Sequence, residues 1–538
     1  MKIIYLLFLS VSLVLASCSE NKNLHNSNVQ ELHISIGAAP QSLDPHVLTG
    51  VPELKVLAAI SEPLVKLNLD TMTIEPATAE SWEISESGLI YTFKIRQTAH
   101  WSDGSAVTAH DFVFSWQRAL MAAVAWQYAT DYYVIKGAEE YHQSADPSPE
   151  MLGVTALNDH TLQFELNYPA PLFLSRLSSE IIVPIQRQAL LSHGEIDQIQ
   201  SDWTLAENYI SNGPFVLKTW ELNKVLIAEK NPYYWDKENV RLEKVHIYPL
   251  ETESAEERAY RSGQIQVAFG GRIPVNKIAT YREQQPNNIK IQPAYGIYNY
   301  LINTTKAPFD DARVRQALSH AIDRQAIVDN ITKAGEIVAT SITPPTPGYS
   351  ELLPDTQYDL AKAKQLLADA GFPNGEGFPS FSLLYNTSDV HRKIALAIQQ
   401  MWKINLGIDT TLENQEWKVY LDTRQSKNYD VSRAGSISLL GDPIDFLESY
   451  ITGHGMNDSG WSNTEYDRLI KAASTELNQA KRSKLLAEAE KILLQEAPTI
   501  PIYYYVYSYL VADNVKGLHI NPLSRIDYKS IYIETDTQ

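Results

Sequence analysis

Residue types that carry catalysis are present in this 538-residue chain, but they do not form a catalytic pattern. The nucleotide pattern G-x-x-x-x-G-K, the zinc-protease pattern H-E-x-x-H and the nucleophile pattern G-x-S-x-G do not occur. The stretch GHGMNDSG at 453–460 has glycines but lacks the lysine of a phosphate site. Asp310 and Asp311 stand where a helix is predicted to begin, so capping explains them. We therefore expect no enzyme activity, no cofactor and no metal site, and favour a binding role.

Two cationic side chains stand out as possible ligand contacts. Arg433 opens the stretch RAGSISLLGDP, a short mixed run that ends in a Gly-Asp-Pro turn. On local grounds this run is a strand with a charged end. His391 follows the segment NTSD on a predicted helix, with no histidine or carboxylate at metal-ligand spacing. The local pattern leaves open whether either residue faces solvent or a ligand.

Length and charge limit the class of protein. At 100 to 200 residues per domain, the chain predicts roughly two to four domains. The formal net charge is -19, and no block of lysine and arginine offsets it. Because such a surface repels phosphate backbones, we expect no nucleic-acid partner.

The N-terminus predicts export. The apolar run Ile3–Ala16 is too short to span a membrane but fits the apolar region of a signal peptide. It leads into Leu-Ala-Ser-Cys at 15–18, which resembles the lipobox of bacterial lipoproteins, and Cys18 is the chain's single cysteine. We expect 1–17 to be a signal peptide, Cys18 a lipid anchor and 18–31 a tether. The mature protein would then lie in the periplasmic space or at the cell surface, with lipid as its only membrane attachment.

Hydrophobic periodicity predicts mixed helices and strands. Strands are expected at 32–36, 89–95, 408–412, 429–434 and 498–511. Helices are expected after Thr108, from Asp311 to 328, from Asp359 to Gly371, in a segment that ends at Gly407, and from 464 to 495. The fold class is therefore α/β with at least two lobes.

Several passages resemble the oligopeptide-binding proteins that serve ABC importers. They include SLDPH (42–46), SNGPFVL (211–217), KNPYYWD (230–236), KAPFDDARVRQALSHAIDR (306–324) and LENQEWKVYLDTRQSKNYDVSRAG (412–435). The passages keep the family's order and span nearly the whole mature chain. The resemblance implies the substrate-binding component of a peptide ABC transporter, a monomer that delivers its ligand to an inner-membrane permease.

The resemblance also implies an architecture, a two-lobed periplasmic-binding-protein clamshell with a third, inserted domain. The first lobe would comprise 32–61, 188–295 and 507–538. The inserted domain would take 62–187, and the other lobe 296–506.

In this family the peptide is held as an added β-strand, which gives affinity without reading side chains. The matching backbone segments are Thr49, Gly50 and Val51 from one lobe and Gly435, Ser436 and Ile437 from the other. Tyr128 and Trp417 match aromatic residues of the ligand pockets. His391, Arg424 and Arg433 match cations that hold the ligand's carboxylate.

The chain departs from the family at the ligand's amine. Aligning RAG and the DP turn places Leu439 where the family has the aspartate that holds the α-amine, and Ser436 where it has a tryptophan. A buried ammonium without a carboxylate is costly. Either Asp442 or Asp445 replaces that aspartate, or the ligand is not an ordinary free-amine peptide. The second case fits a protein for murein or amine-blocked peptides, acting in recycling or sensing.

Overall fold

The structure is a computed structural model that describes residues 29–48, 50–71, 73–346, 348–353, 358–438, 440–519 and 521–534. The predictions for Cys18, Thr49 and Leu439 fall outside these residues. Within the described ranges, no helix combines the length and the apolar character needed to cross a membrane.

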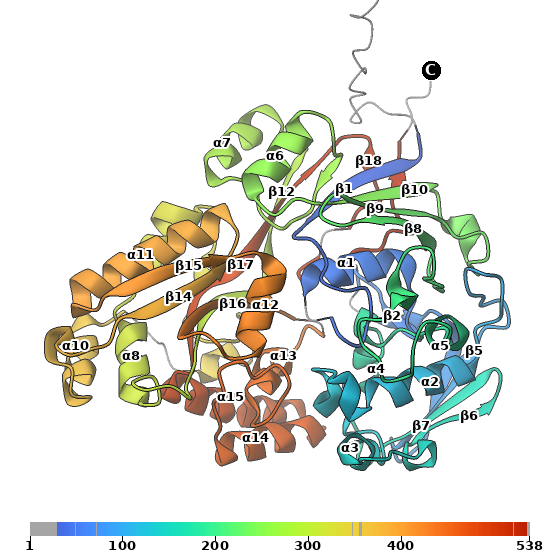
Figure 1. Cartoon of the computed structure of the whole chain (residues 1–538), viewed down its shortest axis with the longest axis horizontal. Helices are drawn as coiled ribbons and strands as arrows, with labels where there is room; N and C mark the ends of the chain where they lie inside the picture. Colours follow the sequence, from blue (N-terminus) through green and yellow to red (C-terminus); the bar gives the residue numbers. More distant parts are fainter. Residues whose placement is uncertain are drawn as a thin grey trace, which may run out of the picture.

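One large mixed sheet runs through the molecule (Figure 1). Its strand order is β15-β14-β16-β12-β17-β11-β1-β10-β9-β8, with β13 paired to β17. In that order the bounds are Thr410–Gln415, Phe381–Asn386, Val431–Ile437, Ile289–Ile302, Thr499–Val511, Val267–Ala268, Glu31–Gly37, Lys244–Pro249, Val225–Lys230, Phe215–Glu221 and, for β13, Ile337–Val338.

Two long antiparallel strands, β12 and β17, connect the two sides of this sheet. Their pairing extends from Ile289 opposite Leu510 to Leu301 opposite Thr499. Every residue of β17 is buried, which fits a strand made mostly of β-branched and aromatic residues. In Figure 1 this pair lies between the helical body on the left and the part that carries β1 and α1 (Val51–Ile60).

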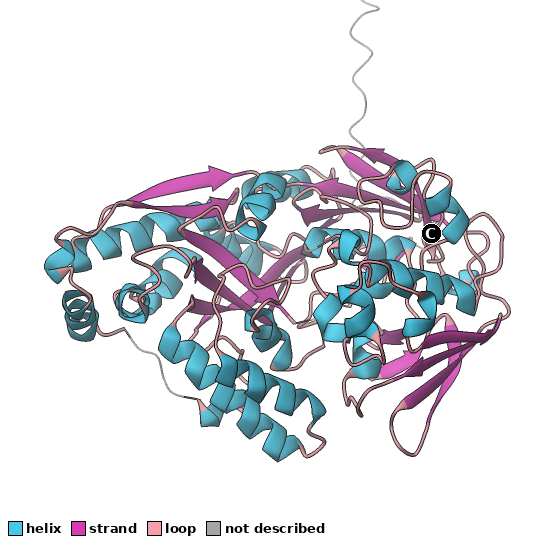
Figure 2. Ribbon diagram, turned by 60° about the horizontal axis from the view of Figure 1, so that its bottom comes forward, coloured by secondary structure: helices cyan, strands magenta, loops and turns pink. Residues whose placement is uncertain are grey.

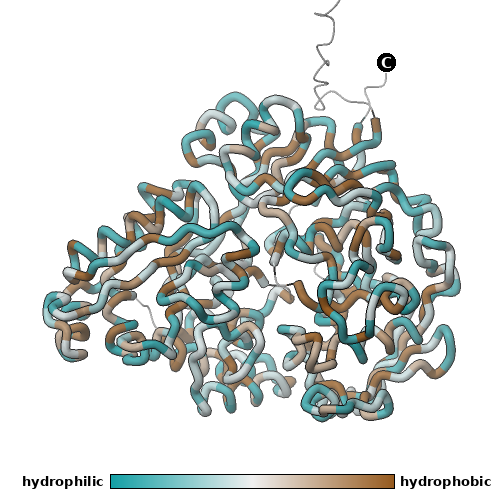
Figure 3. Tube along the Cα trace, viewed as in Figure 1, coloured by the Kyte–Doolittle hydropathy of each residue, from teal (hydrophilic) through white to brown (hydrophobic). Residues whose placement is uncertain are grey.

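Helices cover the sheet on both sides of this pair. The left-hand body of Figure 1 contains α8 (Ala312–His320), α10 (Leu360–Asp369), α11 (Asp389–Leu406), α14 (Thr464–Thr475) and α15 (Gln479–Glu496). At the top lie α6 (Glu253–Arg261) and α7 (Val275–Gln284). The tube of Figure 3 is mostly hydrophilic along α6, as expected for an outer helix.

A separate four-stranded antiparallel sheet has the order β4-β5-β7-β6. The bounds are Ala79–Ile84, Ile90–Ile95, Thr161–Glu165 and Val154–Asn158. Helix α2 (Ala109–Ala119) packs on it and begins with a capping box between Thr108 and Asp111. Figure 2 shows this small sheet apart from the large one. It falls within 62–187, but the limits of the three domains stay a prediction.

The remaining elements are short. They are β2 (Val65–Leu67), β3 (Ile74–Pro76), β18 (Val515–Lys516), β19 (Tyr532–Ile533), α3 (Ala138–Gln143), α4 (Phe173–Arg176), α5 (Arg187–Leu191), α9 (Arg324–Ile327), α12 (Trp417–Gln425) and α13 (Ile444–Leu447).

Two helix predictions were wrong in extent. The helix predicted over 464–495 is two helices, because the backbone leaves the helical region at Glu476 and Asn478 caps α15 through its side chain. The helix predicted from Asp311 to 328 ends at His320, and Asp323 caps the separate helix α9. Both caps are asparagine or aspartate residues inside an otherwise continuous apolar period, which conceals the break from a periodicity analysis.

Candidate ligand-binding site

A cavity of about 210 Å³ lies where segments from distant parts of the chain meet. Because a single water needs about 10–15 Å³ of such space, the cavity can hold an organic solute. Of the residues predicted to contact a ligand, those that line it are Gly50, Val51, Tyr128, Trp417, Arg424, Arg433, Gly435, Ser436 and Ile437. The structure therefore brings together nine positions spread over almost 390 residues.

One wall of the cavity is the strand β16, which has an incomplete set of strand partners. On one side it pairs with β12 along its whole length. On the other side β14 pairs only with Val431 and Ser432. The Arg433 carbonyl accepts a hydrogen bond from the Tyr420 hydroxyl. Because backbone groups alternate in direction along a strand, Gly435 and Ile437 face the same way as Arg433, toward an edge with no strand partner in the described part of the chain.

The Arg433 guanidinium stands at one end of this edge. It donates to the Tyr505 hydroxyl at 2.6 Å, and it lies 4.9 Å from the centre of the Tyr298 ring. Its buried Nε has no hydrogen-bond partner among the described residues, and no carboxylate of those residues forms an ion pair with it. Arg433 Nη1 also donates to Asn386 Oδ1 at 3.4 Å. A guanidinium held by a phenol hydroxyl, an amide oxygen and a ring face keeps its charge available for an anion.

Gly435 permits this arrangement. A Cβ atom at this position would lie 2.1 Å from the Tyr505 hydroxyl oxygen and 3.1 Å from an Arg433 Nη2. Because Tyr505 supports the guanidinium, a side chain at 435 would displace the group that orients Arg433. The absence of a side chain at Gly435 therefore lets Tyr505 hold Arg433 in place.

Arg424 lines the cavity but already has a charge partner. Its Nε lies 2.6 Å from Asp458 Oδ2; the Asp458 side chain is buried and that of Arg424 is 11% exposed. This pair neutralises Arg424, so the residue offers a ligand less free charge than Arg433 does.

His391 lies close to this group without lining the cavity. Its ring centre is 5.4 Å from that of Tyr298, and its Nδ1 has no hydrogen-bond partner in the described chain. Burial, and then the nearby Arg433 and Arg272, hold its pKa well below the usual value, so the imidazole is neutral. Its predicted contact with a ligand carboxylate stays a prediction.

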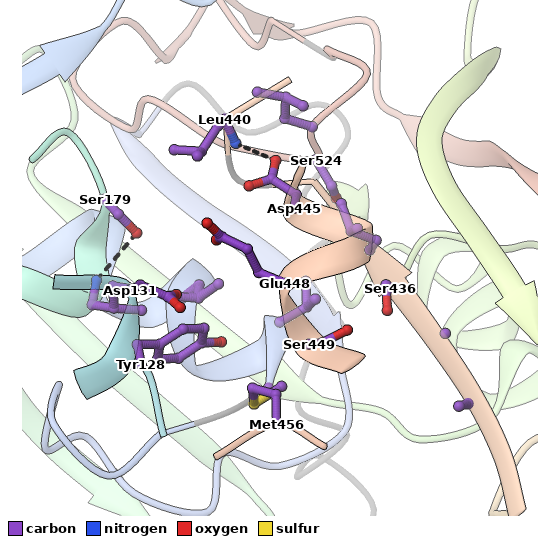
Figure 4. A pocket seen from close by; sticks show the side chains of 18 of the residues that line it. Tyr128, Asp131, Ser179, Ser436, Leu440, Asp445, Glu448, Ser449, Met456 and Ser524 are labelled. Carbon is purple, nitrogen blue, oxygen red and sulfur yellow. Dashed lines mark hydrogen bonds between the residues drawn. The ribbon is translucent and has the colours of Figure 1, made fainter. Parts of the chain in front are cut away.

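The opposite side of the cavity is acidic. In Figure 4 the carboxyl groups of Asp131, Asp445 and Glu448 and the hydroxyl of Tyr128 point toward the same space. Burial, followed by Asp131, raises the pKa of Tyr128 above its usual value. Tyr128 therefore stays a neutral hydroxyl, able to donate or accept a hydrogen bond.

Two basic side chains, those of Arg176 and His454, lie beside these acids. Arg176 donates to both oxygens of Glu448 at 2.5 and 2.7 Å and lies 3.6 Å from Asp131. His454 Nε2 lies 2.7 Å from Asp131. Burial by itself would lower the pKa of His454. The neighbouring Asp131 raises this pKa by more than burial lowers it, so the net shift is upward. No local sequence pattern marks these four residues, and their partners are remote in the chain, so none of the four was predicted as a site residue.

The two candidate replacements for the family's aspartate differ in the structure. Asp442 is engaged in a bidentate pair with Arg482, with both N–O distances 2.8 Å. Asp445 lines the cavity, and its Oδ2 accepts from the Ser438 hydroxyl and from the Leu440 N–H at 2.8 Å. Burial raises the pKa of Asp445 to about 7, against those hydrogen bonds. Asp445 is thus the carboxyl group that remains open to a ligand cation.

Comparisons with known proteins agree with this geometry. Residues 73–458 match the model of the bacterial extracellular solute-binding proteins, family 5. The chain belongs to this family. It is 37% identical to the periplasmic oligopeptide-binding protein OppA of Salmonella typhimurium, over 92% of this chain and 91% of that protein. It is also 37% identical to the periplasmic murein peptide-binding protein MppA of Escherichia coli, over 94% and 93% of the two chains.

Solved structures identify the fold of this family 5 protein. The Escherichia coli murein tripeptide-binding protein MppA superposes with a TM-score of 0.89 at 36% identity, covering 94% of this chain and 99% of that one. Haemophilus influenzae OppA in complex with RPPGFSPFR gives 0.89 at 31% identity, with the same two coverages. The expected α/β clamshell with an additional domain is confirmed, and the chain is a solute-binding protein.

The same comparisons indicate the conformation. The unliganded open form of MppA is 36% identical and covers 94% of this chain and 98% of that one, but its TM-score is 0.64. Because the identity is the same, the lower score reflects the arrangement of the parts and not the sequence. The structure therefore describes an arrangement unlike that open form.

Proposed function

We propose that this protein binds a short peptide or peptide-like solute in the cavity and delivers it to an ABC permease in the inner membrane. The free edge of β16 carries this proposal. An added strand can pair with Gly435 and Ile437 through its backbone, which gives affinity with little side-chain selection. The names of the relatives, oligopeptide-binding and murein peptide-binding proteins, support the same ligand class.

The charges at the two ends of the edge fit a peptide's termini. Arg433 would hold the carboxylate, and Asp445, next to the far end of the edge, would hold an ammonium. At about 3.3 Å per residue, the strand from Arg433 to Ile437 spans about 13 Å, the length of three to four extended residues. Charge at both ends then sets the register of a ligand of about this length.

The alternative ligand is a murein or amine-blocked peptide, used in recycling or sensing. It is favoured by Asp442, whose carboxylate is taken by Arg482. It is also favoured by the pKa of Asp445, which leaves a large share of that carboxyl uncharged near neutral pH. A blocked amine could accept or donate a hydrogen bond there without requiring a charged partner.

Cys18 would keep the exported protein at a membrane through lipid while the remainder stays in water. A single chain would be sufficient, since all the groups named above come from one copy. These two expectations, the lipid anchor and the monomer, belong to the proposal.

The test begins with native mass spectrometry of the purified full chain and its co-purified ligands. Calorimetry then compares one tripeptide with its C-terminal amide and its N-acetyl form. We expect the amide to bind at least tenfold more weakly. Weaker binding of the N-acetyl form would favour free-amine peptides, while equal or tighter binding would favour the blocked-peptide alternative. Absence of any peptide-like ligand and of tripeptide binding would contradict the proposal.

Transport is tested separately in the organism that naturally makes the protein. Deletion of the protein should abolish uptake of a labelled ligand, and a Cys18→Ala chain should lose its membrane attachment. Ligand binding with undiminished uptake after deletion would indicate sensing in place of transport.

A further inference from the structure

A second cluster of ligating side chains lies outside the cavity, where β1 pairs with β10. His33 and His246 are register partners on these parallel strands. Their rings are stacked, with centres 4.1 Å apart and planes 6° from parallel. Glu31 precedes His33 by two residues, so its side chain leaves the same face of the strand. Its Oε2 lies 3.9 Å from His33 Nε2 and 3.3 Å from His246 Nε2.

The strand alternation isolates this cluster from the core. Leu32 and Ile34, on the other face of β1, are fully buried. The side chains of His33 and His246 are 13% and 15% exposed, while that of Glu31 is 36% exposed. The cluster is thus shielded from bulk water yet reachable by a small ion from the side of Glu31.

Tyr248 orients one of the rings. Its hydroxyl lies 2.9 Å from His33 Nδ1. When Nδ1–H donates to Tyr248, the lone pair of Nε2, the atom that lies 3.9 Å from Glu31 Oε2, is free to bind a metal ion. A hydrogen bond to the second ring nitrogen is the usual means by which proteins fix a metal-binding histidine.

Hydrogen bonding within the cluster leaves the charge of Glu31 without a permanent cation. Lys244, on the same strand as His246, pairs with Glu229 at 2.9 Å. Among the described residues Glu31 forms no ion pair with a lysine or an arginine, and its neighbours are the two histidines. A half-buried carboxylate beside two imidazole nitrogens is a donor set that a divalent cation would satisfy.

We propose that Glu31, His33 and His246 form a binding site for a divalent transition-metal ion of the zinc class. Two imidazoles and one carboxylate suit Zn²⁺, Co²⁺, Ni²⁺ or Cu²⁺, with water completing the coordination. Mg²⁺ and Ca²⁺ prefer oxygen ligands and would bind poorly. The bound ion would bridge β1 and β10 near the start of the described chain, and so stabilise this part of the sheet. The sequence conceals the site, because its histidines are 213 positions apart.

The experiment uses the full chain, produced without a polyhistidine tag and stripped with a chelator. ZnCl₂ is titrated in competition with a chromophoric chelator, and the unfolding temperature is recorded with and without the ion. We expect one Zn²⁺ per chain with a Kd of about 10 µM or below, a higher unfolding temperature with Zn²⁺, and no effect of Mg²⁺ at the same concentration. His246→Ala and Glu31→Gln should each weaken binding at least tenfold.

The matched control is His110→Ala. His110 also lies beside a carboxylate, Asp159, at 3.4 Å, but this exposed pair has no second imidazole. The His110→Ala variant should bind Zn²⁺ as tightly as the parent chain. Glu31→Gln is nearly isosteric and protects the test if His246→Ala folds poorly. Zn²⁺ binding weaker than about 100 µM in the parent chain, or equal affinity in the parent and Glu31→Gln chains, would overturn the site.

Discussion

Arg176 binds both carboxylate oxygens of Glu448 at the acidic side of the cavity, although 272 positions separate the two residues in the chain. Asp131 and His454 form a second pair beside them. Arg176 and Asp131 come from the predicted inserted domain, and Glu448 and His454 from the predicted lobe 296–506. These pairs therefore join two regions that the sequence predicts to be separate domains.

Glu448→Gln should weaken ligand binding by about three- to tenfold, because it removes half of a largely buried charge pair that favours the closed arrangement. Calorimetry measures the affinity, and small-angle scattering measures the compactness of the ligand-free chain. The control is Glu465→Gln, whose exposed pair with Arg468 at 2.7 Å contributes little. Equal affinity in the two variants would contradict a closing role for Glu448.

Arg433→Met should mainly weaken ligand binding, whereas Arg424→Met should mainly lower the stability of the fold. Arg433 has no carboxylate partner in the described chain, so its loss should weaken binding of a free-carboxylate ligand by ~2 kcal/mol with little change in unfolding. Loss of Arg424 leaves Asp458 buried without its cation, which should lower the free energy of unfolding by about 3 kcal/mol. Urea unfolding and calorimetry on both variants check the contrast, which a similar stability loss in each would refute.

Gly435→Ala should weaken binding about tenfold, since the added methyl displaces the Tyr505 hydroxyl from Arg433. Tyr505→Phe removes the atom that the methyl meets. The double variant should consequently bind no more weakly than Tyr505→Phe alone, a non-additivity typical of residues in contact. Additive losses in this double-mutant cycle would disprove the coupling between Gly435 and Tyr505.

Asp445→Asn should stabilise the ligand-free protein at pH 8. Burial raises the pKa of Asp445 to about 7, whereas an unfolded aspartate titrates near 4. Between about pH 4 and 7 the native state binds the extra proton, so this group makes stability fall as pH rises. The amide removes this cost and can still accept from Ser438 and Leu440. We expect a gain on the order of 1–3 kcal/mol at pH 8 and little at pH 4, measured by urea unfolding.

His454 should stabilise the fold while its imidazole is protonated and lose that contribution when it is deprotonated. Its pKa is raised, because Asp131 outweighs burial. Its contribution is therefore complete below about pH 6.5, the unfolded value, and is lost as pH rises through the folded value. His454→Gln should reduce stability more at pH 6 than at pH 9. A difference between variant and parent that is independent of pH would argue against a charged His454.

Local sequence predicted much of the secondary structure, because caps and periodicity act over a few residues. Strands β1 and β5 and helix α2 lie where alternation and Thr108 place them. The apolar period predicted α14 and α15 as one helix, since the capping role of Asn478 depends on a backbone turn and not on that period. The resemblance to oligopeptide-binding proteins, carried by motifs in the family's order, predicted the clamshell fold and nine of the residues that line the cavity.

The charge partners were decided only by the tertiary structure. The sequence marked Arg424 and Arg433 as equivalent cations, yet the fold gives Asp458 to one and tyrosines to the other. It also brings His33 beside His246, which no spacing in the chain suggests. The sequence by itself determined which short segments form helices, strands and motifs. Which charges meet was determined by strand register and chain crossings, because these depend on pairing between segments hundreds of residues apart.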